Sequence, residues 1–160
     1  MDLLFEQKLT NNTALASHLI SMAIRECFES KERKSGVELP LVFTILPLVF
    51  HKATAESLAN KKRPGALIKA LSENREIPLG LQERMEGFAD LTLAALNLSF
   101  AANLLYLDVN GTMEIVPGKE SKMDFTHPQI KTSINAAKRV GQSLSELNVE
   151  QLCIYLNIRF

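Results

Sequence analysis

Residues 39–50, Leu-Pro-Leu-Val-Phe-Thr-Ile-Leu-Pro-Leu-Val-Phe, form an almost wholly apolar stretch around which the rest of the chain must pack. Because apolar residues occupy successive positions, their periodicity does not separate a buried helix from a buried strand. Pro40 fits the first turn of a helix, whereas Pro47 would kink or break that helix. A proline in a central strand would be equally awkward. We therefore favour a buried, kinked helix and keep a strand as the alternative.

Helical spacing of apolar residues recurs on both sides of this stretch. Residues 13–30 place Leu15 and Leu19 on one face, and Asn12 or Thr13 can cap that helix by accepting hydrogen bonds from its first free N–H groups. Further helices are predicted from a cap at Thr54 to Leu58, from Ala66 to near Asn74, from Pro78, and from a cap at Asp90 or Thr92.

The pattern changes at residues 104–116, where two apolar runs flank Asp108-Val109-Asn110-Gly111. Asn-Gly between apolar runs is the strongest short signal for a β-hairpin, since both central residues of a type I′ turn need a positive φ. The sequence therefore predicts one hairpin, with Pro117-Gly118 ending its second strand and a polar loop running on to Asp124.

Two more helices are predicted after the hairpin. Thr126 is expected to cap a long helix that starts at His127. Asn148, with Gln151 three residues later, resembles a capping box for a last helix over residues 149–156. The expected fold class is mainly α with one β-hairpin (α+β), in a winged-helix-like arrangement of helices plus a long C-terminal helix.

Length and composition describe one ordinary globular domain covering residues 1–160. The 160 residues are 46% apolar and 22% charged, which is too apolar for a disordered chain and long enough to bury a core without disulfides. The predicted core consists of Leu15, Leu19, Phe43, Leu46, Phe50, Leu96, Phe100, Leu104, Ile130, Ile134 and Leu144.

The charges argue against a dedicated nucleic-acid binder. Eighteen Lys and Arg residues balance eighteen Asp and Glu residues, whereas such a protein usually carries a clear basic excess. Residues 91–107, which would occupy the recognition-helix position of a winged-helix unit, contain no Lys or Arg for phosphates and base edges. We expect this segment to pack in the core or against a partner.

The sequence also indicates a cytoplasmic protein with no membrane contact. The start of the chain, Met-Asp-Leu-Leu-Phe-Glu-Gln-Lys, lacks the basic and apolar regions of a signal peptide. Residues 91–107 are shorter than a comfortable membrane span and contain polar side chains. Cys27 and Cys153 lie far apart, so we expect free thiols in a reducing compartment.

No residue pattern predicts chemistry, so we expect no catalytic, metal or cofactor site and no enzyme. His18, His51 and His127 each lack a second ligand at metal spacing. His18 is expected at a surface or boundary, and His51 is the most interesting because it closes the apolar stretch. A Gly-x-Ser-x-Gly elbow and a glycine-rich phosphate loop are both absent from the sequence.

Basic residues form three short clusters, at residues 31–34, 61–63 and 131–139. Most such clusters are ordinary solvated surface, but they can also contact a phosphate backbone or an acidic partner. Lys61, Lys62 and Arg63 form the sharpest cluster because they are contiguous at a loop tip. These three residues and Arg159 are the predicted contacts to a partner or to phosphate.

The order of several segments matches that of a known family. The segments are Asn12–Leu15, Leu39–Phe43, Leu46–Lys52, Leu104-Leu105, Ala136–Gly141 and Leu156–Arg159. Together they resemble the middle components of ABC three-component systems, small bacterial proteins encoded between an SMC- or Rad50-like ATPase and an effector. Lamassu-type phage defence belongs to that group. The most specific piece is the Leu-Pro-Leu-Val-Phe-His-Lys run ending at Lys52.

The resemblance implies a non-catalytic adaptor. The ATPase would sense DNA, and the middle component would bridge the ATPase to the effector, which we expect to be a nuclease, and hold it inactive. DNA would then be contacted through the complex. Two other classes stay open from the residues alone: a winged-helix DNA-binding regulator and a small unclassified enzyme.

Overall fold

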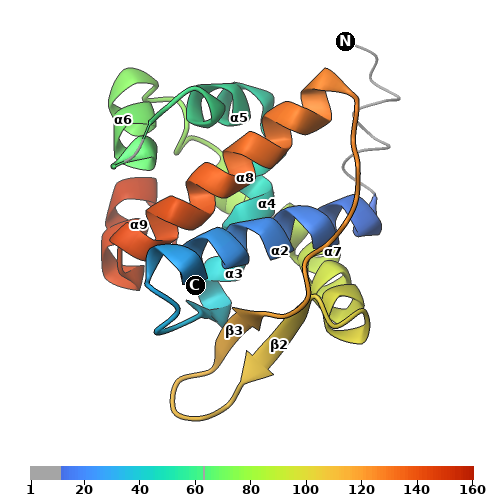
Figure 1. Cartoon of the computed structure of the whole chain (residues 1–160). Helices are drawn as coiled ribbons and strands as arrows, with labels where there is room; N and C mark the ends of the chain where they lie inside the picture. Colours follow the sequence, from blue (N-terminus) through green and yellow to red (C-terminus); the bar gives the residue numbers. More distant parts are fainter. Residues whose placement is uncertain (1–11, 63) are drawn as a thin grey trace.

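The computed structural model describes residues 12–62 and 64–160, which form a helical body with a small antiparallel sheet at one end (Figure 1). The helices are α2 Thr13–Ser30, α3 Leu39–Val42, α4 Ile45–Val49, α5 Lys52–Ala59, α6 Ala66–Glu73, α7 Leu81–Ala101, α8 Pro128–Glu146 and α9 Val149–Leu156. The strands are β1 Val37–Glu38, β2 Leu105–Asp108 and β3 Glu114–Pro117. The prediction of a mainly α fold with a β-hairpin is confirmed.

The apolar stretch is helical, so the strand alternative is wrong. The helix breaks between Val42 and Ile45, one turn before the proline that was expected to break it. Pro47 has no N–H to donate to the carbonyl of Phe43, four residues earlier, so α3 ends there. Pro47 then lies in the first turn of α4, where its missing N–H needs no partner.

The apolar stretch fills the interior of the helical body. Every residue of α4 is buried, and α4 packs against α2, α7 and α8. Among the described residues, no single helix is long and apolar enough to cross a membrane; α3 and α4 pass such a test only together with α5, after a bend of 99°.

Helices α2 and α8 cross (Figure 1), and their backbones come very close at Gly141. At the crossing, a Cβ on Gly141 of α8 would overlap the backbone carbonyl of Ala23 in α2. Small or medium side chains, Ala136, Ala137 and Val140, are fully buried on the same face of α8. The glycine therefore sets the distance between the two helices.

Helix α7 contacts α2 through a polar contact inside the core. The Ser99 hydroxyl donates to the Ala95 carbonyl at 2.8 Å, so the Ser17 hydroxyl must donate to Ser99 at 2.6 Å. Helix α7 runs unbroken for 21 residues, so the predicted second helix start at Asp90 or Thr92 is wrong. Thr92 is fully buried in the helix interior, and its side chain caps nothing.

The hairpin is confirmed, but it belongs to a three-stranded sheet of order β1-β3-β2. Strand β1, which was not predicted, pairs Val37 with Ile115 of β3. The turn is also different from the expected type I′: residues 109–113 separate the strands, and only Gly111 has a positive φ, of 98°. The Asn110 N–H instead donates to the Asp108 carboxylate at 2.9 Å, which closes the loop as an Asx turn.

Helix caps are confirmed at two places and wrong at two others. Asn12 accepts from the Leu15 N–H at 3.0 Å, and both hydrogen bonds of the Asn148–Gln151 capping box are present. The cap of α8 is His127 instead of Thr126, because Pro128 occupies the first helical position and holds the preceding residue extended.

The cap of α5 is His51 instead of Thr54. Thr54 lies inside α5, and its hydroxyl oxygen is 2.6 Å from Nδ1 of His51. The histidine that closes the apolar stretch is therefore fixed by the next helix.

The predicted core is largely confirmed. Leu15, Leu19, Leu46, Leu96 and Leu144 are buried, and the three phenylalanines and two isoleucines pack half-buried against them. The prediction of Leu104 as a core residue is wrong by one position. The chain turns after α7, so the side chain of the next residue, Leu105, points inward.

His18 of α2 holds the loop of residues 118–127 that runs from β3 to α8 (Figure 1). Its Nδ1 lies 2.8 Å from the Ser121 hydroxyl oxygen, and its ring centroid is 5.3 Å from that of Phe125. Arg25, two turns further along α2, donates to the Gly118 carbonyl. His18 is 4% exposed, so the expectation of a surface or boundary residue is wrong.

We expect Gly141→Ala to lower the free energy of unfolding by about 1–3 kcal/mol, because the added methyl group would force α2 and α8 apart. The matched control is Gly87→Ala in α7, where an added Cβ meets no atom within 4 Å. That change should stabilise the protein by up to about 1 kcal/mol, since alanine is the better helix former. Urea denaturation measures both, and effects of equal sign would contradict the close crossing.

Stability should also fall as the solution is acidified below pH 6.5. Burial lowers the pKa of His18, and burial together with the charge of Arg84 lowers the pKa of His51. The unfolded chain therefore takes up protons first as the pH drops, which favours unfolding; above pH 6.5 both states are neutral and the stability is fully present.

Urea melts between pH 7 and about pH 5 test this dependence on the two histidines. His18→Gln and His51→Gln should each remove part of the slope of stability against pH, and the double variant should remove both parts. A double variant with the parent's slope would contradict the assignment.

Candidate functional site

The predicted basic cluster lies in the connection between α5 and α6. Lys61 forms an ion pair with Glu73 of α6, and its side chain is only 19% exposed. Lys62 is exposed, and Arg63 lies outside the described residues. Lys61 therefore helps to join α6 to the segment before it. Of the two described residues of this cluster, Lys62 is the one whose side chain faces solvent.

Arg159 lies elsewhere, against the start of α7. Its backbone N–H donates to Oε1 of Gln82 at 3.0 Å, and its carbonyl accepts from Nε2 of the same side chain at 3.3 Å. The side-chain amide of Gln82 thus fixes the segment that follows α9. Arg159 and the basic cluster thus have different partners: Arg159 bonds to Gln82 of α7, and Lys61 pairs with Glu73 of α6.

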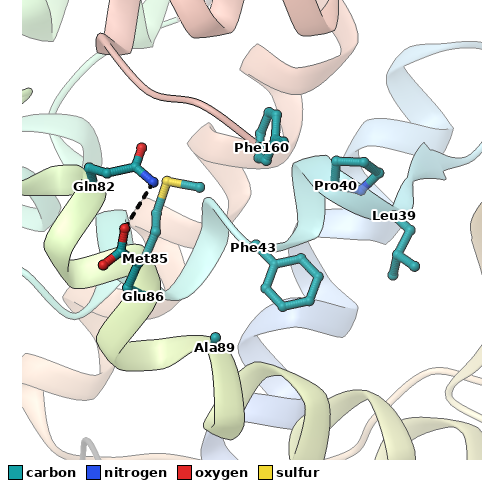
Figure 2. Close-up of a pocket in the computed structure, with 8 residues that line it drawn as sticks. All are labelled: Leu39, Pro40, Phe43, Gln82, Met85, Glu86, Ala89 and Phe160. Carbon is teal, nitrogen blue, oxygen red and sulfur yellow. Dashed lines mark hydrogen bonds between the residues drawn. The ribbon is translucent and has the colours of Figure 1, made fainter.

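The two hydrogen bonds between Gln82 and Arg159 form a clamp on this tail. Next to the clamp is an open apolar groove of about 370 Å³ (Figure 2). Helix α7 forms one wall, α3 forms the facing wall, and Phe160 stands at one end. The side chains around it are Leu39, Pro40, Phe43, Gln82, Met85, Glu86, Ala89 and Phe160. The sequence placed Leu39, Pro40 and Phe43 in the apolar stretch and in a segment of the family resemblance, and it placed the α7 residues in a predicted helix. It did not predict that these segments meet in a groove.

A cluster of polar groups fixes the α7 wall. Arg84 donates to the carbonyls of Ile77 and Leu79 at 3.2 and 3.0 Å, which secures the turn before α7. Burial lowers the pKa of Arg84, and its charge in turn lowers the pKa of His51, which is already lowered by burial. The guanidinium therefore faces into the fold and holds the helix start in place.

Comparison with known families decides what this chain is. A family described as ABC-three component (ABC-3C) system Middle Component 3 matches residues 2–160. The chain belongs to this family. No curated protein and no solved structure matches it. The resemblance drawn from the sequence segments is thereby confirmed.

In this middle component, two of the segments that carry the resemblance meet in space. Leu39–Phe43 forms one wall of the groove, and the segment Leu156–Arg159 leads directly to Phe160 at its end. Asn157 makes the turn between α9 and this tail with a positive φ of 53°, and Ile158 is buried behind it. The groove thus joins the apolar stretch to the far end of the chain.

The middle component also exposes apolar side chains on its hairpin, which projects from the helical body (Figure 1). Tyr106, Leu107, Val109 and Met113 are each 40–66% exposed. Strand β2 is an edge strand of the sheet. Exposed apolar groups on a projecting edge are typical of a surface that contacts another protein.

The described part of the middle component can be examined for metal-binding groups and reactive thiols. Within residues 12–62 and 64–160, no three His, Cys, Asp or Glu side chains are grouped closely enough to hold a metal ion. Cys27 and Cys153 are free thiols. Burial raises the pKa of the Cys27 thiol, which keeps it protonated and unreactive within the core.

We expect Gln82→Ala to loosen the tail of the middle component without unfolding it. The variant loses both hydrogen bonds to Arg159, each worth about 0.5–1.5 kcal/mol, so the Arg159 amide should exchange with deuterium about tenfold faster. Gln129→Ala in the first turn of α8 is the control: it removes the same side chain from a different helix and should leave that rate unchanged. Equal exchange rates in the parent and Gln82→Ala would show that the clamp does not form.

Proposed function

We propose that this protein is a non-catalytic adaptor that bridges an SMC- or Rad50-like ABC ATPase to an effector, which we expect to be a nuclease. The complex would act in bacterial defence against phage or plasmid DNA, as in Lamassu-type systems. The observation that carries the proposal is the family match over residues 2–160, because it makes the whole chain a middle component.

Bridging requires two separate contact surfaces, and the described residues offer two. One is the groove between α3 and α7, and the other is the hairpin with its exposed apolar side chains. They are built from different elements, so one partner can occupy each. Apolar surface left open on a small chain is typical of a subunit that completes its burial in a complex.

DNA contact by the isolated chain is not part of the proposal. Between residue 91 and the hairpin, α7 carries no Lys or Arg and exposes Leu93 and Leu98. A helix that enters a DNA groove needs donors for phosphates and bases, and exposed leucines suit a protein surface better. Lys62 and Arg159 stay in the proposal as charged contacts at the edge of a partner interface.

The experiment is co-expression with the ATPase and the effector encoded beside this chain, followed by purification of each combination. We expect the chain to bind each partner alone and to be required for the ATPase to retain the effector. The measurement is the composition of each complex by size-exclusion chromatography with light scattering.

Two variants on the hairpin test whether it and the groove bind different partners. Val109→Lys and Met113→Lys on the hairpin should release one partner and keep the other, since both side chains are at least half exposed and contribute little to the core. An ATPase–effector complex that forms equally well without the chain would refute the bridging role.

A further inference from the structure

Apolar side chains continue along α7 past the end of the α3–α7 groove. Ala89 lines the groove, and Leu93, one helical turn later, is 49% exposed on the same flank of the helix. Phe100 follows two turns further along and is half-buried. The apolar strip is therefore longer than the hollow itself, and it runs parallel to the α7 axis.

A line of negative charge accompanies this strip. Glu86 is at the rim of the groove, and Asp90 is one turn further along α7; both side chains are exposed. Arg84 does not neutralise them, because its guanidinium is turned inward to the carbonyls of Ile77 and Leu79. Gln82 donates weakly to Glu86 at 3.4 Å (Figure 2), and the same amide group also bonds to the backbone of Arg159.

Two further charged residues lie near the groove. Arg159 is held beside Gln82 by its backbone, and Glu38 is the N-cap residue of α3 on the opposite wall. The carboxylates that follow the α7 side of the groove are those of Glu86 and Asp90.

We propose that this groove binds an amphipathic helix of a protein partner, whose apolar side chains enter the groove and whose basic side chains lie against Glu86 and Asp90. The inference rests on the proposed function, because the partner is the ATPase or the effector. A helix fits since apolar positions at i and i+4 on α7 match the same spacing on a second helix laid beside it. Charge complementarity selects a basic helix over an acidic one.

The hollow suits this occupant better than a small polar ligand. Ligand sites usually combine an apolar lining with a few polar groups aimed inward. Here the polar side chains are Gln82, which is committed to the tail, and Glu86, which is on the rim. Phe50 and Phe88, with ring centroids 5.6 Å apart, pack the end of α4 against α7 and support this wall.

A photo-crosslinking amino acid at position 89, in the full co-expressed complex, identifies the occupant by mass spectrometry. The expected product joins position 89 to a helix of the ATPase or effector that carries leucine, isoleucine or phenylalanine and flanking lysine or arginine. A crosslink to residues 1–11 of the same chain, to a second copy, or to an acidic segment would overturn the inference, and so would no crosslink in an assembled complex.

Charge reversal provides the quantitative test. Glu86→Lys with Asp90→Lys should weaken binding of the crosslinked partner about tenfold, measured by titration of the purified components. Reversing the partner's crosslinked basic residues should restore the affinity. The matched control is Glu120→Lys with Asp124→Lys, an equal change of charge in the exposed loop held by His18, and it should bind as the parent does.

The outcomes separate this inference from the function on which it rests. If the parent chain does not assemble with either partner, both proposals fail. If the parent assembles and the Glu86 and Asp90 variant binds as well as the control, the adaptor role stands and the groove inference is wrong.

Discussion

Helices α8 and α2 pack so closely at Gly141 that there is no space for a side chain between them. Gly141 faces the backbone of Ala23, and a single methyl group there would overlap a carbonyl oxygen. Both helices also contact α4, so the distance between them fixes the space into which the apolar stretch must fit. Helix α2 in turn contacts α7 and β3. The position of nearly every element therefore follows from this one crossing.

The sequence predicted best what depends on neighbouring residues. Asn12 and the Asn148–Gln151 box were found because a cap is formed by groups three residues apart. The break in the apolar stretch was expected at Pro47 and lies earlier, since proline removes the hydrogen bond to the residue four positions before it. Strand β1 was missed because two residues become a strand only when Ile115, far along the chain, pairs with them.

The groove could not be read from the sequence for a similar reason. Its walls come from residues 39–43, from the first turns of α7 and from Phe160, and no spacing rule connects three segments so far apart. Arg159 was predicted as a contact residue, and the structure places it at the end of the groove through its backbone. Two of the segments that carry the family resemblance, Leu39–Phe43 and Leu156–Arg159, meet at the groove. The sequence shows that both segments matter, but only the fold shows that they are neighbours.

The hydrogen bonds between Gln82 and Arg159 also bear on the shape of the groove. Phe160 forms part of the groove, yet it is attached to the body mainly through Ile158 and one glutamine side chain. A substitution at Phe160 would therefore reshape the groove while leaving the crossing of α2 and α8 untouched. If the groove receives a partner as proposed, a change at Phe160 would alter which partner fits while the folded body stays the same.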